Sequence, residues 1–422
     1  MRDLEVIVTS ARFGVVAFVS ALLLAGCGEE KKEEQAAAPA QEQPAEPAQP
    51  AEQTATTEQP ATAPATGEQQ AASTPTAEPG SGGELNVYNW SDYIGETTVE
   101  DFQNETGITV RYDVYDSNET LDAKLKAGNT GYDIVVPTGS FLGQQIQAGI
   151  YQKIDKSKIS NYGNIDPQIL EALKPFDPTN EYAVPYFWGT VGIGVDVAKV
   201  KERLGENAPI DSFDLLFKPE NAEKLQDCGI SMLDSPSDIL PPALKYLGKD
   251  PHSKSEADYA EVEKMLTAVR PYVKYFHSSQ YINDLAGGEL CAVIGWSGDV
   301  FIAQARAEEA GSTAEITYTI PKEGTLLWVD SLAIPKDAKN VENALKFIDY
   351  LNRPQVAANG VNYVSYASPN TAALELVDPE VKANTSIYPN DEVKKNLFAD
   401  APVDPELDRL RTRVWTKVKT GQ

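Results

Sequence analysis

Residues 85–137 read LNVYNWSDYIGETTVEDFQNETGITVRYDVYDSNETLDAKLKAGNTGYDIVVP and set the expected fold. Short β-rich runs alternate here with helical patterns: strands at 85–88, 108–114 and 133–136, and helices at 97–105 and 117–127. Ser117 is suited to cap the second helix, and Gly128 is suited to end it. The apolar run at 133–136 is typical of a buried parallel strand, and Pro137 ends it. This alternation predicts the start of a doubly wound α/β fold.

Composition and net charge limit the classes of function that the chain can have. The chain has 422 residues, of which 41% are hydrophobic, so it can bury a large core and is expected to form two lobes or more. Sixty-three acidic and 36 basic side chains give a net charge of −27, which repels phosphate backbones and argues against a nucleic-acid partner. The two histidines, His252 and His277, and three cysteines leave little material for a zinc site or a histidine base. A function built on binding cations has ample carboxylates.

Residues 1–27 have the features of a lipoprotein signal peptide. An apolar run at 13–26 follows Arg2 and Arg12 and is too short to span a bilayer. It ends in Leu24-Ala25-Gly26-Cys27, which resembles the lipobox of bacterial lipoproteins, where the cysteine is diacylated and becomes the mature N-terminus. A free buried cysteine is the alternative interpretation. Because diacylglycerol supplies two chains on one residue, Cys27 would anchor the protein stably to a membrane.

Residues 28–83 differ from the rest of the chain in composition. They contain no Val, Ile, Leu, Met, Phe, Tyr or Trp, and Ala, Pro, Glu, Gln and Thr dominate. Such a segment cannot offset the entropy of ordering, so it is predicted to be a disordered tether. Its ten glutamates and two lysines account for only part of the net charge of −27, so the body at 84–422 is itself acidic.

Five motifs distributed over residues 84–422 narrow the class of protein. They are YNWSDY at 88–93, TGYDIVVP at 130–137, YFHSSQYINDL at 275–285, IGWSGD at 294–299 and RTRVWTKVK at 411–419. Together they resemble the periplasmic polyamine-binding proteins of ABC importers, the putrescine- and spermidine-binding group. The motifs are most similar to the putrescine-binding branch of that group.

The resemblance implies a two-lobed type II periplasmic binding protein fold, in which two α/β lobes close on a hinge around a ligand. It places the first lobe at 84–187 and 311–353, and the second lobe at 188–310 and 354–422. It also implies a monomer without enzymatic activity, cofactor or metal, which captures putrescine or spermidine and delivers it to an inner-membrane ABC permease. A polyamine-sensing adaptor for a membrane receptor would use the same fold and is the alternative function.

The chemistry of a polyamine sets the requirements for its site. The ligand carries an ammonium at each end of an apolar methylene chain. Desolvating an ammonium costs several kcal/mol unless carboxylates or hydrogen bonds compensate, so a dry cleft needs acids near both ends. Aromatic rings can pack against the methylenes and attract the cations, at about 0.5–2 kcal/mol for each well-placed cation.

The first motif contains four residues that the resemblance assigns to the site: Trp90, Ser91, Asp92 and Tyr93. Asp92 would pair with one ammonium, with Ser91 as an acceptor beside it and the two rings as a wall. From local sequence alone, Ser91 and Asp92 could equally cap the helix that begins near residue 97.

Three further candidates follow predicted strand ends, where open α/β sheets place their ligands. Thr138 and Ser140 follow the strand at 133–136, and Asp238 lies in a loop after a strand at 230–233. The resemblance places Thr138 in the cleft, with Ser140 beside it, and gives Asp238 an acidic position that is often Glu in relatives. Alternatively, the two hydroxyl residues cap a helix starting near residue 141, and Asp238 is a solvated helix cap.

The resemblance assigns five more residues, which combine rings with acids: Trp296, Asp299, Trp328, Asp330 and Tyr366. The two glycines in the stretch at 295–299 predict a tight loop that brings Trp296 and Asp299 together. Trp328 and Asp330 are two residues apart, so on a strand they would project to one face. Several putrescine-selective relatives carry Phe in place of Trp328, and the larger indole would cover more of a longer polyamine. Tyr366 would complete the aromatic box, with core packing as its alternative role.

Cys228 and Cys291 match a pair that is bridged in the relatives, and an exported protein can form disulfides. The bridge would stiffen the second lobe behind Trp296 and Asp299. Two buried free thiols are the alternative.

The sequence lacks the motifs of two other classes of protein, hydrolases and calcium-binding proteins. Neither histidine accompanies a Gly-x-Ser-x-Gly elbow, which argues against a hydrolase. The sequence has no Asp-x-Asp-x-Asp-Gly loop, and its aromatic residues flank its acids, which favours organic cations over metal ions.

Overall fold

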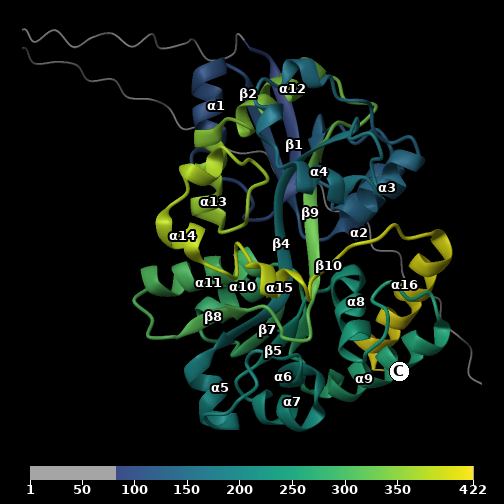
Figure 1. The fold of residues 1–422 in the computed structure, drawn as a ribbon, viewed down its shortest axis with the longest axis vertical. Coiled ribbons are helices and arrows are strands. Elements are labelled where there is room, and N and C mark those ends of the chain that lie inside the picture. Colours follow the sequence, from purple (N-terminus) through teal and green to yellow (C-terminus); the bar gives the residue numbers. More distant parts are fainter. Residues whose placement is uncertain (1–81, 422) are drawn as a thin grey trace, which may run out of the picture. The chain divides into compact units, whose positions relative to one another are not determined.

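The computed structural model describes residues 82–421 (Figure 1). The predicted signal peptide, the lipidation site Cys27 and nearly all of the predicted tether lie outside these residues. Within the described range, no helix combines the length and the apolar character that a membrane crossing requires.

The strands of the described residues form one mixed sheet of ten strands. They are β1 (Glu84–Trp90), β2 (Thr109–Tyr115), β3 (Ile134–Val135), β4 (Ala183–Asp196), β5 (Ile230–Met232), β6 (Tyr275–Phe276), β7 (Ala292–Trp296), β8 (Ile316–Thr319), β9 (Leu326–Ala333) and β10 (Phe398–Ala399). The strand order is β2-β1-β3-β9-β4-β7-β5-β6, with β10 paired to β9 and β8 paired to β4.

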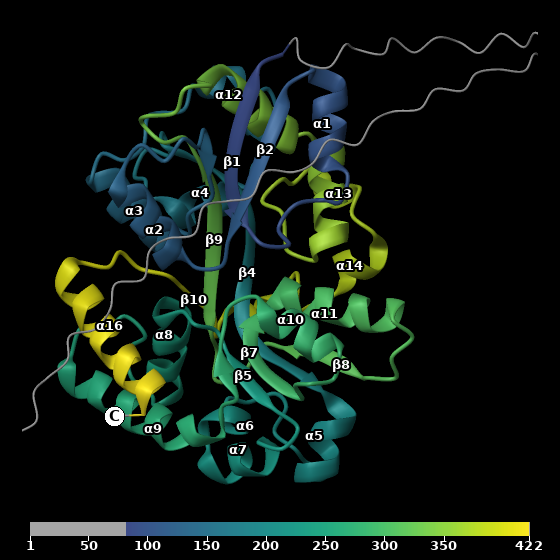
Figure 2. The ribbon, with the colours of Figure 1, turned by 180° about the vertical axis from the view of Figure 1, so that it is seen from behind.

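The helices pack around this sheet (Figures 1 and 2). They are α1 (Thr98–Thr106), α2 (Asn118–Ala127), α3 (Gly139–Gln147), α4 (Pro167–Leu173), α5 (Val197–Leu204), α6 (Asp214–Phe217), α7 (Pro219–Leu225), α8 (Pro236–Tyr246), α9 (Glu256–Val269), α10 (Gln280–Ala286), α11 (Ser297–Glu309), α12 (Val341–Leu351), α13 (Pro354–Val364), α14 (Pro379–Ala383), α15 (Asp391–Lys394) and α16 (Pro405–Thr420). The order of helices and strands is that of an α/β protein, so the expected fold class is confirmed.

The predicted strand–helix alternation at the start of the body is confirmed. Strand β1 pairs in parallel with both β2 and β3, and α1 and α2 are the two expected helices. Ser117 caps α2 by accepting a hydrogen bond from the Thr120 backbone N–H, and Gly128 follows the last turn. Local signals therefore fixed these elements to within a few residues.

Strand β4 belongs to both lobes. Its residues up to Thr190 pair with β9, whereas those from Val191 onward pair with β7 and β8. Strand β9 runs antiparallel beside it and also pairs with β3. All residues of β4 are buried, which suits a strand that has neighbours along its whole length. Strands β4 and β9 therefore join the lobes, and Figure 1 shows them running between the two groups of elements.

Two segments differ from the predicted lobe boundaries. Strand β8, expected in the first lobe within 311–353, pairs with the second half of β4 and packs on α11, so it belongs to the second lobe. Helix α13, expected in the second lobe, packs against α12 of the first lobe as well as against α11. The chain thus returns to the first lobe at β9, the crossover strand, and α13 contacts both lobes. Helix α16 then packs against α8 and α9 of the second lobe.

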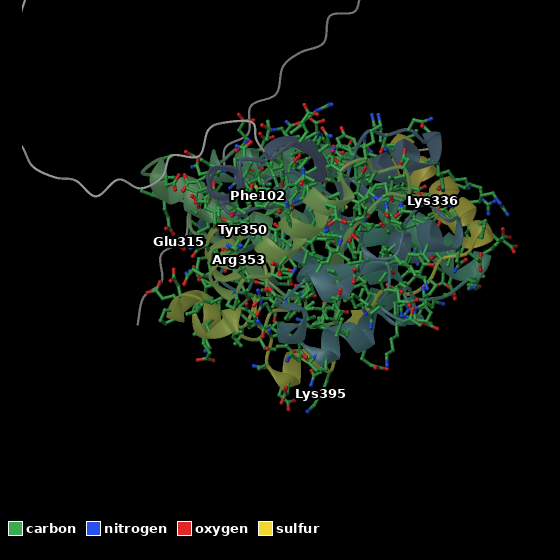
Figure 3. All side chains as sticks on the ribbon, turned by 90° about the horizontal axis from the view of Figure 1, so that it is seen from above. Phe102, Glu315, Lys336, Tyr350, Arg353 and Lys395 are labelled. Carbon is green, nitrogen blue, oxygen red and sulfur yellow. A yellow bond between two sulfur atoms is a disulfide. The ribbon has the colours of Figure 1, made fainter. Side chains whose placement is uncertain are left out.

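The outer part of the first lobe is held by aromatic packing between α1 and α12 (Figure 3). Phe102 of α1 packs against Tyr350 of α12, with ring centroids 5.3 Å apart. The guanidinium of Arg353 lies 4.9 Å from the centre of the Tyr350 ring and pairs with Glu105 of α1 at 2.8 Å. These contacts attach α12 to α1.

The buried carboxylate of Asp133 ties the start of β3 to two distant segments. It accepts hydrogen bonds from the backbone N–H groups of Asn86, Lys339 and Asn340. The side-chain amides of Asn86 and Asn340 also donate to it, at 3.2 and 3.0 Å. Because Thr138 follows only a few residues later, this network helps to set the position of Thr138 at the cleft.

The predicted disulfide between Cys228 and Cys291 is confirmed, with Cα atoms 5.5 Å apart. Cys291 directly precedes β7, whose last residue is Trp296, and Cys228 follows α7. The bridge closes a loop of 63 residues, for which chain entropy alone suggests about 4 kcal/mol of stabilisation. It braces the second lobe behind the residues that reach the cleft.

Candidate ligand-binding cleft

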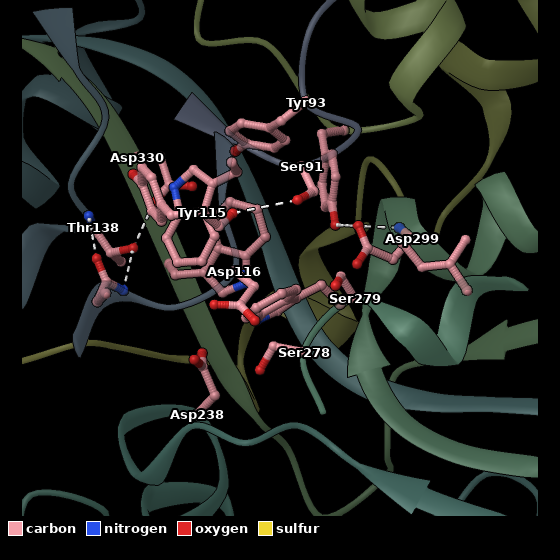
Figure 4. Close-up of a pocket in the computed structure, with 16 residues that line it drawn as sticks. Ser91, Tyr93, Tyr115, Asp116, Thr138, Asp238, Ser278, Ser279, Asp299 and Asp330 are labelled. Carbon is pink, nitrogen blue, oxygen red and sulfur yellow. Dashed lines mark hydrogen bonds between the residues drawn. The ribbon is translucent and has the colours of Figure 1, made fainter. Parts of the chain in front are cut away.

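A cavity lies where the two lobes meet (Figure 4). Its lining comes from segments of both lobes: Trp90, Ser91, Tyr93, Tyr115, Asp116, Asn118, Thr138, Asp238, Ser278, Ser279, Ile282, Trp296, Asp299, Trp328, Asp330 and Tyr366. No Lys, Arg or His is among these described lining residues, whereas four are aspartates. The cavity is therefore acidic and aromatic.

The structure brings together ten of the twelve residues expected from the sequence. Asp92 and Ser140 are the two that do not line the cavity. Six lining residues were not anticipated: Tyr115, Asp116, Asn118, Ser278, Ser279 and Ile282. Tyr115 is the last residue of β2, and Asp116 and Asn118 follow it, so the strand-end rule for α/β sheets could have found all three. The other three lie within the motif at 275–285.

Asp330 is held by neutral donors from the first lobe. It lies on β9, two residues after Trp328, and both side chains reach the cavity, as the strand spacing predicted. Thr138 Oγ1 donates a hydrogen bond of 2.6 Å to Asp330 Oδ1. Thr138 in turn is fixed by Asn118, whose side chain donates to Thr138 Oγ1 at 2.9 Å and accepts from its backbone N–H at 3.1 Å. Burial raises the pKa of Asp330 to about 7, although the bond from Thr138 opposes this shift.

Two tyrosine hydroxyls donate hydrogen bonds to Asp299, one from α10 and one from the segment after α13. Tyr281 donates to Asp299 Oδ2 at 2.8 Å, and Tyr366 donates to Oδ1 at 2.5 Å. Burial raises the pKa of Asp299 to about 7, and the two hydrogen bonds oppose this shift. Figure 4 shows Asp299 and Asp330 on opposite sides of the group of lining residues.

The expected loop at 295–299 is absent from the described structure. Strand β7 ends at Trp296, and α11 begins at Ser297, so Asp299 lies in the first turn of a helix. The two glycines allow aromatic rings to approach the backbone closely, and they do not form a turn. A Cβ on Gly295 would lie 2.7 Å from the ring of Tyr281, and one on Gly298 would lie 2.4 Å from the ring of Tyr366. Both tyrosines can therefore reach Asp299 only because these positions lack side chains.

Asp238 lies in the first turn of α8, and not in the loop expected from the sequence. It is buried, with 6% of its surface exposed, so it is not a solvated cap. Ser235 Oγ donates to Asp238 Oδ2 at 2.7 Å. Burial raises the pKa of Asp238 to about 6, and the bond from Ser235 opposes this shift. The cavity thus has a third buried acid, contributed by the second lobe.

Aromatic rings from both lobes contact one another around the cavity. Trp90 of the first lobe meets Trp296 of the second edge to face, with centroids 5.4 Å apart. Tyr366 lies 5.1 Å from Tyr93 and 5.3 Å from Trp328. Trp90 is fixed by a hydrogen bond of 2.9 Å from its indole N–H to the carbonyl of Val136. These rings form the apolar wall that the methylenes of an organic cation require.

Asp92 lies at the edge of the cleft, outside the cavity lining. Its φ of 53° is in the left-handed region, which is uncommon for a residue with a side chain. Its carboxylate pairs with Arg306 of α11 at 2.5 Å, and Arg306 also donates to Asn283 at 2.8 Å. Asp92 therefore connects the two lobes. Ser140 is buried in the first turn of α3, away from the lining.

The acids of the cleft do not form a metal site. Across residues 82–421 no group of three or more His, Cys, Asp or Glu side chains is arranged to hold a metal ion. Three buried carboxylates separated by rings instead suit a linear organic cation with charges at separate points.

Two lobes joined by crossover strands, with an acidic and aromatic cavity between them, define a solute-binding protein of the type II fold. A family comparison gives the same class: the family described as bacterial extracellular solute-binding protein matches residues 97–389. The chain belongs to this family.

Individual relatives support the resemblance drawn from the motifs. The chain is 52% identical to the putrescine-binding periplasmic protein of Escherichia coli (strain K12), over 80% of this chain and 92% of the relative. It is 51% identical, with the same coverage, to the putrescine-binding periplasmic protein of Pseudomonas aeruginosa (strain UCBPP-PA14). Among solved structures, a putative spermidine/putrescine ABC transporter protein from Listeria monocytogenes matches with a TM-score of 0.72 and 30% identity, over 80% of this chain and 99% of that chain.

Replacing Asp299 by Asn should remove part of the pH dependence of the stability of the ligand-free protein. Burial raises the pKa of Asp299 from 3.8 to about 7, so the folded chain holds this proton more tightly than the unfolded chain does. The contribution of Asp299 to stability therefore falls as the pH rises from about 4 to about 7. The free energy of unfolding of Asp299→Asn, relative to that of the wild type, should therefore be about 1–3 kcal/mol higher at about pH 8 than at about pH 4.5 in denaturant titrations.

The exposed carboxylate of Asp337 provides the matched control. Asp337→Asn should leave the free energy of unfolding nearly unchanged at both pH values. If the difference in free energy of unfolding between Asp299→Asn and the wild type were the same at both pH values, burial of this charge would carry no net cost.

Proposed function

We propose that the protein captures a polyamine such as putrescine or spermidine reversibly, without chemistry, and delivers it as a monomer to an ABC permease. The observation that carries this proposal is the pair of buried acids, Asp299 and Asp330, in one aromatic cavity whose lining contains no basic side chain. The relatives named above are binding proteins for putrescine, which supports the same ligand class. Two solved structures similar to this chain belong to spermidine/putrescine ABC transporters, which favours transport over sensing.

The cavity accounts for both parts of such a ligand. One ammonium would pair with Asp299 and the other with Asp330, and Asp238 would contribute to whichever end lies nearer. The methylene chain would lie along the indoles of Trp296 and Trp328. Each ligand ammonium would pair with an ionised carboxylate and would thereby offset the cost of burying that charge without a basic partner.

Calorimetry of the purified protein against putrescine, cadaverine, spermidine, spermine, arginine and calcium tests the ligand class. At least one polyamine should bind with a Kd below about 100 µM, whereas calcium should not. Asp299→Asn and Asp330→Asn should each weaken that binding by about 30-fold or more, because a desolvated ammonium loses its partner, at about 2–5 kcal/mol.

Asp337→Asn is again the control and should change the affinity by less than about threefold, as expected for an exposed carboxylate. No polyamine binding below about 100 µM would end the proposal. Unchanged binding in both Asn variants would show that the ligand binds outside this cavity.

Trp328 is proposed to set the preference between short and long polyamines. Its side chain is buried and faces the cavity beside Asp330. Trp328→Phe should lower the ratio of spermidine affinity to putrescine affinity, because the smaller ring covers fewer methylenes of the longer chain. Competition calorimetry with both ligands measures this ratio. An unchanged or higher ratio would place selectivity elsewhere, with Asp238 the next position to test.

We also propose that the protein is a lipoprotein of the periplasm, anchored through Cys27. The two putrescine-binding relatives are periplasmic proteins, which supports this location. The anchor rests on the sequence Leu24-Ala25-Gly26-Cys27. Cys27→Ser should release the protein from the membrane fraction while leaving the polyamine affinity unchanged. Mass spectrometry of the membrane-bound wild-type protein should find the acyl chains, and an unmodified cysteine would rule the anchor out.

A further inference from the structure

Tyr281 lies behind Asp299, outside the lining of the cavity. The side chain is fully buried on α10. Its hydroxyl donates to Asp299 Oδ2 at 2.8 Å and accepts a hydrogen bond of 3.1 Å from the backbone N–H of Trp296. A backbone N–H can only donate, so the hydroxyl must accept on that side. Its single proton is therefore directed at Asp299.

Tyr366 repeats this arrangement on the other carboxylate oxygen. Its hydroxyl accepts from the backbone N–H of Asp299 at 3.2 Å and donates to Asp299 Oδ1 at 2.5 Å. Each oxygen of Asp299 thus faces a hydroxyl whose proton is already committed to it. Both hydroxyls also satisfy backbone N–H groups at the start of α11, which have no intrahelical partner.

This arrangement favours one charge state of Asp299. A protonated Asp299 would have to direct its own proton at a hydroxyl that is already donating, or away from both tyrosines. An ionised Asp299 accepts from both without any rearrangement. The free lone pairs then remain for a cation in the cavity. The hydrogen bonds from Tyr366 and Tyr281 lower the pKa of Asp299 against the larger effect of burial.

Two features of the fold allow the Tyr281 ring to lie close to Asp299. The ring lies against Gly295 of β7, where a Cβ would come within 2.7 Å of Tyr281 Cε2. Helix α10, which carries Tyr281, packs against α11, which carries Asp299. A phenylalanine would fill the same space but would remove the donor to Asp299 Oδ2 and the acceptor of the Trp296 N–H.

We infer that Tyr281 is a positioning residue that favours the ionised form of Asp299 and orients its carboxylate for the ammonium before the ligand arrives. The inference rests on the proposed function for its ligand, but not for the state of Asp299. Other charged or titratable groups act on Asp299 from neighbouring elements: Asp92 after β1, Arg306 on α11, and Tyr366 after α13. Tyr318 on β8 in turn acts on Tyr281. Asp92 and Arg306 act on the pKa of Asp299 in opposite directions and pair with each other. The two tyrosines are the groups that hydrogen-bond directly to its carboxylate.

Tyr281→Phe should weaken putrescine binding in a pH-dependent way. Removing a donor raises the pKa of Asp299 further, so a larger fraction is protonated near neutral pH and must lose its proton before binding. Calorimetry with putrescine should show a loss of about tenfold or more at about pH 6.5, and a smaller loss at about pH 8.5. The midpoint of the affinity against pH should move upward by about one unit.

Tyr259→Phe is the matched control. Tyr259 is also fully buried in the second lobe, and its hydroxyl accepts a hydrogen bond of 2.8 Å from Arg411, away from Asp299. This variant loses a buried hydroxyl in a charged hydrogen bond, as Tyr281→Phe does, so it reports the purely structural effect. Its pH profile should coincide with that of the wild type. An unshifted profile for Tyr281→Phe, or an equal shift for Tyr259→Phe, would overturn the inference.

A ligand-free measurement separates this inference from the proposed function. Carboxyl ¹³C NMR of the wild type and of Tyr281→Phe should show Asp299 titrating at a higher pH in the variant, whatever ligand the protein takes. If no polyamine binds the wild type but this shift is seen, the proposed ligand fails and the role of Tyr281 stands. If Tyr281→Phe does not fold, Gly295→Ala, which displaces the Tyr281 ring, should give the same upward shift. Identical titration of Asp299 in the wild type and the variant would refute the inferred role of Tyr281.

Discussion

The rest of this structure depends on burying carboxylates that have no basic partner. Asp299 and Asp330 are 5% and 4% exposed, and the side-chain hydrogen bonds that their carboxylates accept come from neutral hydroxyls. A lysine or arginine at the same contacts would stabilise the charges better, but it would occupy the place of a cationic ligand. Hydroxyl donors stabilise the ionised form while leaving the net negative charge available. The stability that the site forgoes has to come from elsewhere in the fold.

The supports around the site show where that stability comes from. Asp330 lies on β9, which together with β4 runs through both lobes (Figure 2). Asp299 follows β7, which starts at the disulfide and ends at Trp296. Thr138 is placed by Asn118 and by the backbone bridge between Thr138 and Asp330. Each acid therefore lies on or beside a buried strand, and not on a loop that could relax away from an unpaired charge.

The sequence predicted what depends on local signals and missed what depends on distant contacts. Strand and helix positions between 84 and 136 were recoverable because caps and apolar periodicity act within a few residues. The lobe assignment of β8 was wrong because it is decided by pairing with β4, more than a hundred residues away. Within one motif, Trp90 and Tyr93 line the cavity and Asp92 does not, since a positive φ at Asp92 turns its side chain out toward Arg306. The role of the glycines at 295 and 298 became apparent only once Tyr281 and Tyr366 were seen beside them.

The placement of Asp92 also bears on how the cleft treats positive charge. Arg306 is close enough to Asp299 to stabilise its ionised form, and Asp92 is close enough to oppose it. Because these two side chains pair with each other at 2.5 Å, their effects on Asp299 largely cancel. An unpaired Arg306 at the cleft edge would repel an incoming ammonium and would compete with it for Asp299. The ion pair thus serves two purposes at once: it connects the lobes, and it neutralises the guanidinium nearest to the buried acid. A motif acid that does not touch the cavity can in this way still protect the charge on which the cavity depends.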